Sequence, residues 1–252
     1  MDNLASQLWD ARVTGFTVPR EELDQIHDLS TAYGVQARQI AYSGQEIGGW
    51  KLGATAEAAL PVIGLDAPFM GPVPKSEIYQ SGAEISLFED HMYFAETEIT
   101  LQLCDRLPPR PDPYSREELG KAVSGWHTSI EIAGFRIEGG PKGLGPLIIA
   151  DGAAHRATIL GSTIDPQSIE TMEVSVQVGD TQGTGGMQSI IWDHILDGLG
   201  YLVANQERLA RRIHFDDIVM TGSLTGMIPV IPGAEIVADF GGTRVQVTTL
   251  AD

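Results

Sequence analysis

The chain has 252 residues, of which 42% are hydrophobic, and this composition is ordinary for a globular protein and excludes a disordered or fibrous one. Its 34 acidic and 16 basic residues give a formal net charge of −18 at pH 7, which disfavours contact with phosphate backbones and anionic lipid surfaces, so neither nucleic-acid nor membrane binding is expected. The single cysteine excludes an internal disulfide, and because the chain shows no signal-peptide pattern and no apolar run of about 18 residues, we expect a cytoplasmic protein.

The first 47 residues are predicted to form a small helical lobe. Apolar residues recur there near helical spacing. A helix is expected to begin near Asp28 or Ser30, either of which is a suitable N-cap, and to run to Ser43-Gly44. We therefore place a first unit at residues 1–47.

Residues 48–252 are predicted to form a β-rich domain, because short apolar runs alternate there with glycine and proline. A short helix is expected at 115–124, where Ser115 and Glu118 occupy the two positions of a capping box. One long amphipathic helix is expected from about 188 to 212. Strands are expected at residues 49–53, 69–74, 83–87, 93–103, 128–137, 172–178, 217–221, 227–231, 234–240 and 243–249. A helical lobe, many strands and one long late helix favour an α+β fold over alternating strands and helices.

The segment around residues 94–103 carries two acidic residues at strand spacing. Glu96 and Glu98 point to the same face of the expected strand, while the opposite face is apolar. Burial of two neighbouring like charges is costly unless one takes a proton or a cation binds between them. The alternative is a solvent-facing edge strand whose two glutamates have no function, and the pair alone does not decide between these readings.

A third acidic residue favours the cation. Glu131 lies between Ile130 and Ile132 in a second apolar strand. Three carboxylates without thiolates or a histidine cluster make a hard oxygen-donor site, and such a site favours Mg²⁺ or Mn²⁺ over Zn²⁺.

Several motifs recur in a fixed order along nearly the whole chain. They are Gly49-Trp-Lys-Leu-Gly-Ala-Thr, Ile63-Gly-Leu-Asp-Ala-Pro-Phe-Met-Gly-Pro, Ala95-Glu-Thr-Glu-Ile, Ile130-Glu-Ile, Ile149-Ala-Asp-Gly-Ala-Ala-His, Thr221-Gly-Ser-Leu-Thr-Gly and Pro232-Gly. As an ordered set they resemble the fumarylacetoacetate hydrolase superfamily, in particular its branch of 2-keto-4-pentenoate hydratases and 2-oxo-acid decarboxylases. The resemblance implies a rolled, mixed β-sandwich around a divalent-metal site, with Glu96, Glu98 and Glu131 as the metal ligands.

The same resemblance implies roles for four further residues. Lys51 matches the lysine of the Gly-Trp-Lys-Leu-Gly motif, which lines the pocket near the substrate, and it is the expected catalytic residue. Ser223 and Thr225 lie in the loop that carries a substrate-contacting hydroxyl group, and Ser76 stands where some hydratases have a pocket aspartate. These three are the expected substrate-binding residues.

The implied activity is the metal-dependent hydration of an unsaturated 2-oxo acid, similar to 2-hydroxypenta-2,4-dienoate, in aromatic catabolism, by a homo-oligomer with Mg²⁺ or Mn²⁺. Several departures from the family pattern leave alternatives open. Tyr93-Phe94, Lys75-Ser76, Gly134-Phe135 and Asp151-Gly152 stand where family members often carry other residues. The alternatives are a 2-oxo-acid decarboxylase, a C–C bond hydrolase, and a non-catalytic partner subunit. His127 and His155 are further candidates, although a lone histidine is more often a structural hydrogen-bonding group than a ligand.

Overall fold

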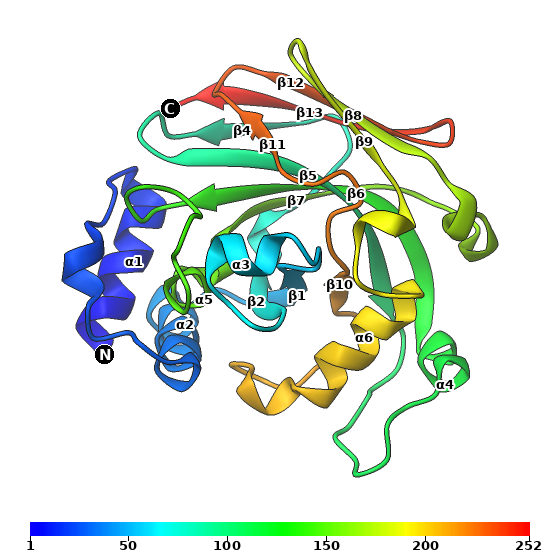
Figure 1. The fold of residues 1–252 in the computed structure, drawn as a ribbon, viewed down its shortest axis with the longest axis horizontal. Helices are drawn as coiled ribbons and strands as arrows, with labels where there is room; N and C mark the ends of the chain where they lie inside the picture. The colour runs from blue at the N-terminus through cyan, green and yellow to red at the C-terminus, as the bar shows by residue number, and fades with distance from the viewer.

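Two curved β-sheets form the centre of the protein, and the computed structural model describes them over residues 1–252 (Figure 1). The larger sheet contains, in order across it, β2 (Phe69–Pro74), β1 (Ile47–Gly53), β10 (Ile218–Met220), β5 (Met92–Leu103), β6 (Val123–Phe135), β7 (His155–Thr163) and β3 (Ile78–Gln80), with β11 (Ile228–Val230) paired to β5. The smaller sheet contains β4 (Ala83–Leu87), β13 (Thr243–Ala251), β12 (Glu235–Phe240), β8 (Val174–Val178) and β9 (Thr181–Gly185).

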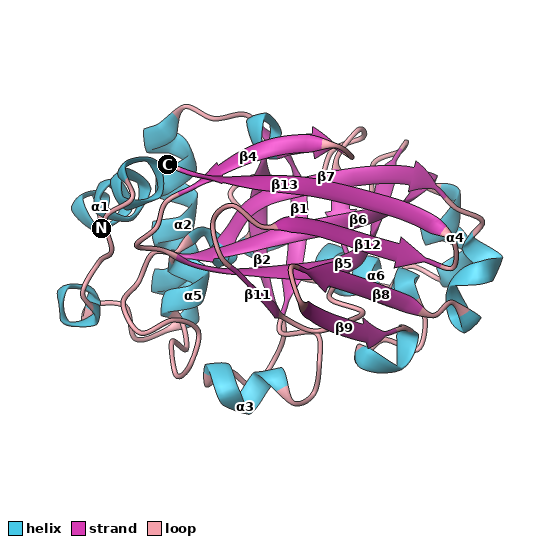
Figure 2. Cartoon of the chain, turned by 90° about the horizontal axis from the view of Figure 1, so that it is seen from above, coloured by secondary structure: helices cyan, strands magenta, loops and turns pink.

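The smaller sheet packs against the outer face of the larger one, as Figure 2 shows from above. Alternate residues of β5 and β6, such as Ala95 and Ile132, are fully buried in an apolar core that also contains Val245 of β13. The other face of β5 and β6 carries the acidic residues. This alternation explains how one strand pair can serve both the core and a polar site.

Helices surround the larger sheet. They are α1 (Asp2–Thr14), α2 (Leu29–Ser43), α3 (Ala59–Ile63), α4 (Arg116–Lys121), α5 (Leu147–Ala150) and α6 (Ile195–Ala204), together with the 3₁₀ turns η1 (Arg20–Leu23), η2 (Lys75–Glu77), η3 (Gly152–Ala154), η4 (Pro166–Thr171), η5 (Met187–Ser189) and η6 (Gln206–Arg208). In Figure 1, α1 and α2 flank one end of the sheet and α4 and α6 lie near the other end. None of these helices combines the length and the apolar character needed to span a bilayer.

Most of the expected elements are confirmed, and the predicted α+β class is correct. Helix α2 begins after Asp28, whose side chain accepts a hydrogen bond of 2.8 Å from the Thr31 N–H, and it ends at Gly44 with φ +66°. The expected capping box of Ser115 and Glu118 is present at α4. Strand β6 begins five residues earlier than expected, and the sequence analysis missed β3, β7 and β9.

The prediction of one long helix over residues 188–212 is wrong. Helix α6 has ten residues, because His194 is extended and caps it at its start, where the ring accepts a hydrogen bond from the Leu196 N–H. Before it, the Ile191 N–H donates a 2.7 Å hydrogen bond to the Thr55 carbonyl oxygen. A tertiary hydrogen bond and a cap therefore prevail over the apolar periodicity in this segment.

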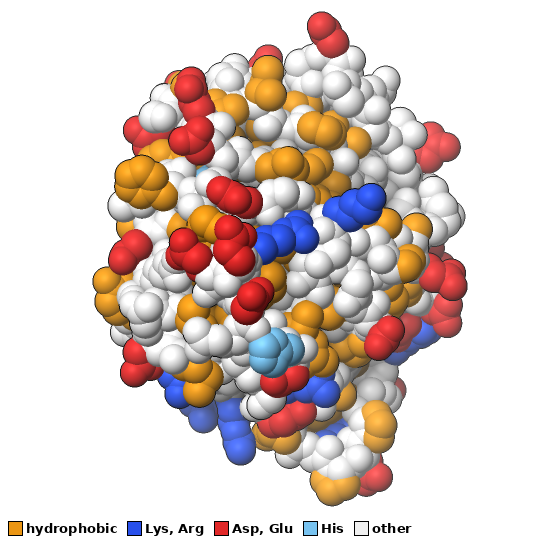
Figure 3. Space-filling model, turned by 60° about the vertical axis from the view of Figure 1, so that its left-hand side comes forward, with side chains coloured by type: hydrophobic (Ala, Val, Ile, Leu, Met, Phe, Trp, Pro, Cys, Tyr) orange, Lys and Arg blue, Asp and Glu red, His pale blue; other side chains and the backbone are white.

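Acidic side chains are spread over the surface. Figure 3 shows a face on which they are scattered, with few lysine or arginine side chains between them. This distribution agrees with the net charge of −18. The surface charge is therefore diffuse on this face, in contrast to the tight cluster inside the protein.

Candidate metal centre

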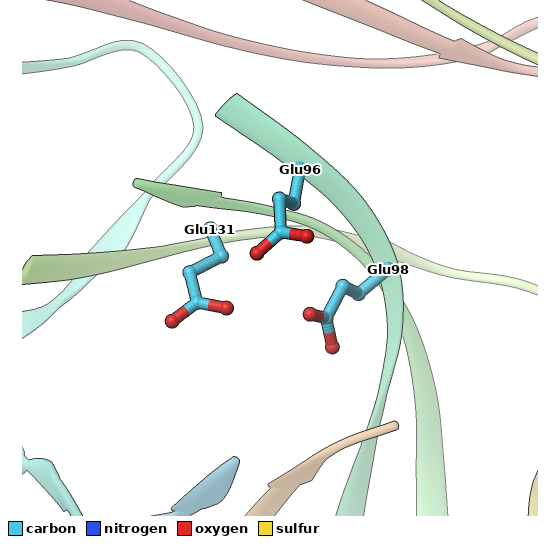
Figure 4. A group of neighbouring side chains, drawn as sticks. All are labelled: Glu96, Glu98 and Glu131. Atoms are coloured by element: carbon cyan, nitrogen blue, oxygen red, sulfur yellow. The ribbon is translucent and has the colours of Figure 1, made fainter. Parts of the chain in front are cut away.

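Three glutamate side chains from two neighbouring strands converge on the inner face of the larger sheet (Figure 4). Glu96 and Glu98 come from β5 and Glu131 from β6, and the antiparallel register places Glu96 directly opposite Glu131. One carboxylate oxygen from each lies within 4.8 Å of the others. Glu98 and Glu131 are buried at 1% and 0% exposure, and Glu96 is partly exposed. The predicted convergence of these residues is therefore present in the fold.

Lys51 lies beside this carboxylate cluster. Its Nζ is 2.9 Å from Oε2 of Glu131, and both side chains are buried. The Phe69 ring centroid is 5.9 Å from the same Nζ. Burial alone would lower the pKa of the Lys51 ammonium group, but the three carboxylates together raise it above its usual value. The carboxylates therefore favour the charged ammonium form of Lys51.

Two glycines explain how the strand that carries Lys51 approaches its neighbours. A Cβ on Gly49 would lie 2.3 Å from the Ile218 carbonyl oxygen, and one on Gly53 would lie 2.2 Å from the Phe69 ring. Only glycine permits both contacts. The motif Gly49-Trp-Lys-Leu-Gly therefore sets the distance at which Lys51 reaches the carboxylates.

The carboxylates differ in their hydrogen bonds. Oε2 of Glu98 accepts a 2.8 Å hydrogen bond from the Gly222 N–H, where the backbone has φ +111°. Oε1 of Glu131 is buried without a partner, and Oε2 contacts only the Lys51 ammonium group. A buried polar atom without a partner is rare and calls for a ligand.

The electrostatics of the cluster favour a dication. Burial, reinforced by the neighbouring carboxylates, raises the pKa of Glu96 to about 7 and the pKa of Glu98 well above its usual value. With all four groups ionised, three carboxylates and one ammonium carry a formal charge of −2, which one divalent cation would neutralise. The all-oxygen donor set and the unpartnered Oε1 of Glu131 therefore fit a hard divalent metal ion.

A cavity of about 460 Å³ opens next to the cluster. Lys51, Glu96, Ser223 and Thr225 are among its lining residues, so four of the expected site residues share it. Two broader hollows of about 640 and 690 Å³ lie elsewhere on the surface, and none of the three clustered glutamates lines either one. The cavity at the carboxylates is thus the candidate substrate site.

The hydroxyl groups of the loop 221–227 face different partners. Oγ1 of Thr225 is 2.9 Å from Oγ1 of Thr97, and Oγ of Ser223 donates to the Gly226 carbonyl oxygen at 3.0 Å. Ser76 is placed apart from them. It is exposed, donates a 2.8 Å hydrogen bond to Gln45, and does not line the cavity, so the structure does not bring it together with the other site residues.

The sequence analysis missed part of the cavity wall. Gly152, Ala153 and Ala154 form a left-handed turn with φ between +56° and +59°, and both alanines line the cavity. Such a conformation costs energy at a non-glycine residue and persists only where the surroundings hold it. Thr55, buried after β1, was also missed. Both alanines belong to the motif Ile149 to His155 noted in the sequence, but the motif alone does not predict a left-handed turn, because alanine favours the right-handed region.

Buried ion pairs hold this turn from behind. The Nε of Arg136 donates to Asp151 at 2.7 Å, and its Nη1 donates to the His155 carbonyl oxygen at 2.9 Å. Arg12 of α1 pairs with Glu77, and Nδ1 of His155 is 3.3 Å from Oε2 of Glu77. Burial alone would raise the pKa of Glu77, but the Arg12 charge and the hydrogen bond from His155 lower it to about 2.

The two histidines considered above do not line the cavity. The Nε2 of His155 is 2.9 Å from the Thr158 hydroxyl group, and the Nδ1 of His127 is 3.3 Å from the Gly161 carbonyl oxygen. Both rings therefore have structural hydrogen-bond partners.

Comparisons with known proteins bear on this site. No family model matches the chain. The chain is 27% identical over 236 residues to the TodF product hydratase of Pseudomonas putida F1, covering 91% of this chain and 87% of that protein. It is 24% identical over 242 residues to the 2-keto-4-pentenoate hydratase of Paraburkholderia xenovorans LB400, covering 92% and 88%.

Solved structures share the fold. The 4-oxalocrotonate decarboxylase from Pseudomonas putida G7, complexed with magnesium and adipate, superposes with a TM-score of 0.84 at 20% identity, over 100% of this chain and 97% of that one. The fumarylpyruvate hydrolase from Pseudomonas aeruginosa, in complex with Mn²⁺ and pyruvate, gives a TM-score of 0.57 at 15% identity, over 81% and 89%.

Proposed function

We propose that the chain is a divalent-metal-dependent hydratase of the fumarylacetoacetate hydrolase superfamily that adds water to an unsaturated 2-oxo acid, because it is similar over most of its length to proteins named hydratases. The convergence of Glu96, Glu98 and Glu131 beside a cavity that also contains Lys51 supports this function. The relatives of similar length that are named hydratases support hydration in particular.

The three glutamates would hold the metal ion, with Mg²⁺ or Mn²⁺ as the expected ion, since all donors are oxygens. When bound, such an ion supplies Lewis-acid stabilisation of the negative charge that develops on the carbonyl oxygen of a 2-oxo acid. The Lys51 ammonium group pairs with Glu131 and balances one of the three carboxylate charges. A single divalent cation is therefore enough to neutralise the remaining two.

Lys51 is the group that we expect to move a proton. Its Nζ is protonated, buried and directed at the carboxylate cluster, and the residue lines the cavity. There it would bind the substrate carboxylate or donate a proton to the reacting carbon atom. The hydroxyl groups of Ser223 and Thr225 would orient the substrate, and the apolar walls would limit the access of bulk water.

Turnover of 2-hydroxypenta-2,4-dienoate by the purified chain tests the proposed function. We expect the diene absorbance to disappear in the presence of Mg²⁺ and to persist after chelation, with no release of CO₂ from a 4-oxalocrotonate control. Release of CO₂ without hydration would identify a decarboxylase instead. A chain that is inactive alone but activates a second subunit would be a non-catalytic partner.

A homo-oligomer is the expected assembly, as the resemblance implies. Light scattering of the purified protein tests it, and a monomer at micromolar concentration would contradict it.

A further inference from the structure

The cavity has one polar end and a long apolar remainder. Lys51 and Glu96 are the only charged residues among its lining residues, and both belong to the carboxylate end. No arginine and no other lysine lines it. A ligand that is anchored at the cluster therefore extends into a region without a cation.

The apolar wall follows β6 away from the cluster. Ala133 and Phe135 lie two and four residues beyond Glu131 and share its face of the strand, and both line the cavity. A strand rises about 3.3 Å per residue, so this wall continues for roughly 13 Å past the carboxylate. With carbon–carbon bonds of about 1.5 Å, a five-carbon acid spans roughly 5 Å. The wall is longer than such a substrate.

Backbone hydrogen bonds join the segment after Pro141 to Val62 and Ile63, which line the cavity. The Gly143 N–H donates to the Val62 carbonyl oxygen at 2.9 Å, and the Gly145 N–H donates to the Ile63 carbonyl oxygen at 2.7 Å. These N–H groups could otherwise bind an anion. On the adjacent wall, the left-handed turn presents only the methyl groups of Ala153 and Ala154.

We propose that the cavity selects a 2-oxo monocarboxylate whose far end is an uncharged, apolar substituent extending beyond the fifth carbon atom, and that it rejects a second carboxylate. This selectivity rests on the proposed function, because the 2-oxo acid group must be anchored at the cluster. A second carboxylate would be buried in a cavity whose other lining residues are mostly apolar and include no further cation, which is unfavourable. An alkyl substituent in the same place gains from the burial of its apolar surface.

Calorimetric binding of unreactive 2-oxo acids to the Mg²⁺-saturated protein tests the selectivity separately from turnover. The series is pyruvate, 2-oxohexanoate and 2-oxooctanoate, with 2-oxoadipate as the dicarboxylate that matches 2-oxohexanoate in length. We expect the Kd to fall about fourfold for each added methylene group. We expect 2-oxoadipate to bind at least about 30-fold more weakly than 2-oxohexanoate.

A variant locates the effect in the apolar wall. Ala133→Leu fills the wall beside Glu131, and we expect it to reduce the ratio of the pyruvate Kd to the 2-oxooctanoate Kd by about tenfold. Ala83→Leu makes the same change in β4 of the other sheet and should keep that ratio. The wild-type series alone decides the selectivity if Ala133→Leu fails to fold.

The outcomes separate the two proposals. If pyruvate binds only with Mg²⁺ but the affinity does not rise with chain length, or 2-oxoadipate binds as well as 2-oxohexanoate, the selectivity is wrong and the proposed function stands. If no 2-oxo acid binds with any divalent ion, both are overturned. Metal-dependent binding that strengthens with alkyl length supports the selectivity even where 2-hydroxypenta-2,4-dienoate is turned over slowly.

Discussion

Replacing Glu131 by glutamine removes one negative charge from the carboxylate cluster while keeping the shape of the side chain. Glu131 is fully buried, its Oε1 has no partner, and its Oε2 contacts only Lys51. With every acidic group ionised, as a bound cation favours, the formal charge of the cluster with Lys51 would change from −2 to −1. Because Glu96 and Glu98 remain beside Lys51, its ammonium group keeps anionic neighbours, so we expect the metal-free variant to fold.

The loss of metal affinity can be worked from the spacing of the cluster. The ligand oxygens lie within 4.8 Å of one another, so a cation between them is close to all three. Two unit charges at 4 Å interact by about 4 kcal/mol at an effective dielectric constant of 20, and a dication doubles this value to about 8 kcal/mol. The amide oxygen of glutamine remains as a neutral ligand. If it retains half of this interaction energy, the loss is about 4 kcal/mol, which raises the Kd for the metal about a thousandfold.

Thermal unfolding at increasing Mg²⁺ concentration measures this loss. At a hundred times its Kd, a ligand stabilises a protein by about 2.7 kcal/mol. For a chain of this size that stabilisation corresponds to a rise in Tm of roughly 5–10 °C. At the same Mg²⁺ concentration, the Glu131→Gln variant should show no measurable rise, because a thousandfold weaker site is then largely empty.

The matched control is Glu84→Gln, which neutralises an exposed glutamate of β4 far from the cluster in the fold. We expect it to keep the full Mg²⁺ response, which would exclude a general effect of net charge. If Glu131→Gln is stabilised by Mg²⁺ as strongly as the wild type, Glu131 is not a ligand and the reasoning above fails.

Three further predictions concern the neighbouring charges. Lys51→Met should lower the rate of hydration at least about 100-fold while Mg²⁺ binding is retained or tightened, since the variant loses a proton donor and a competing cation; diene absorbance and calorimetry measure the two effects. Asp151→Asn should lower the free energy of unfolding by about 3 kcal/mol in urea titrations, because it leaves the buried Arg136 without its charged partner. The carboxyl group of Glu77 is buried, which alone would raise its pKa, but Arg12 and His155 lower this pKa to about 2. Because this pKa is lowered in the folded protein, the ionised Glu77 stabilises the fold above pH 4.5, and this stabilisation is lost as the pH falls toward 2. Urea titrations should therefore show that the Glu77 contribution to the free energy of unfolding falls by about 2 kcal/mol between pH 6 and pH 3. This part of the decrease should be absent in Glu77→Gln.

Each of these predictions has its own control. Lys75→Met removes an exposed lysine from the surface and should leave both hydration and metal binding unchanged. Asp239→Asn removes the partner of exposed Arg244 and should cost less than about 1 kcal/mol. Equal losses in Asp151→Asn and Asp239→Asn would contradict the importance of the buried pair, and an identical pH profile in Glu77→Gln would contradict the role given to that carboxyl group.

The carboxylate cluster could be predicted because it follows from strand periodicity. Glu96 and Glu98 share a face at a spacing of two residues, and Glu131 stands alone between isoleucines, so both patterns are visible in the sequence. Glu96 lies opposite Glu131 because of the register between β5 and β6, and the sequence of neither strand specifies this register. Residue type and strand pattern suggested one oxygen-donor site, and the resemblance to a known family implied these three glutamates as its ligands, but neither gave the register.

Other features depend on tertiary contacts that leave no local pattern. The apolar spacing over 188–212 is helical, but the hydrogen bond from Ile191 to Thr55 and the cap at His194 confine the helix to ten residues. The left-handed turn at Ala153 and Ala154 runs against the preference of alanine and is held by the ion pairs behind it. Such features require the assembled fold to be recognised.

A crystal structure of the protein grown with Mn²⁺ and pyruvate tests the central claim most directly. The account predicts a single anomalous-scattering peak bound by oxygens of Glu96, Glu98 and Glu131, with pyruvate between the ion and Lys51. A cation bound anywhere else, or three carboxylates that hold only water beside bound pyruvate, would contradict it.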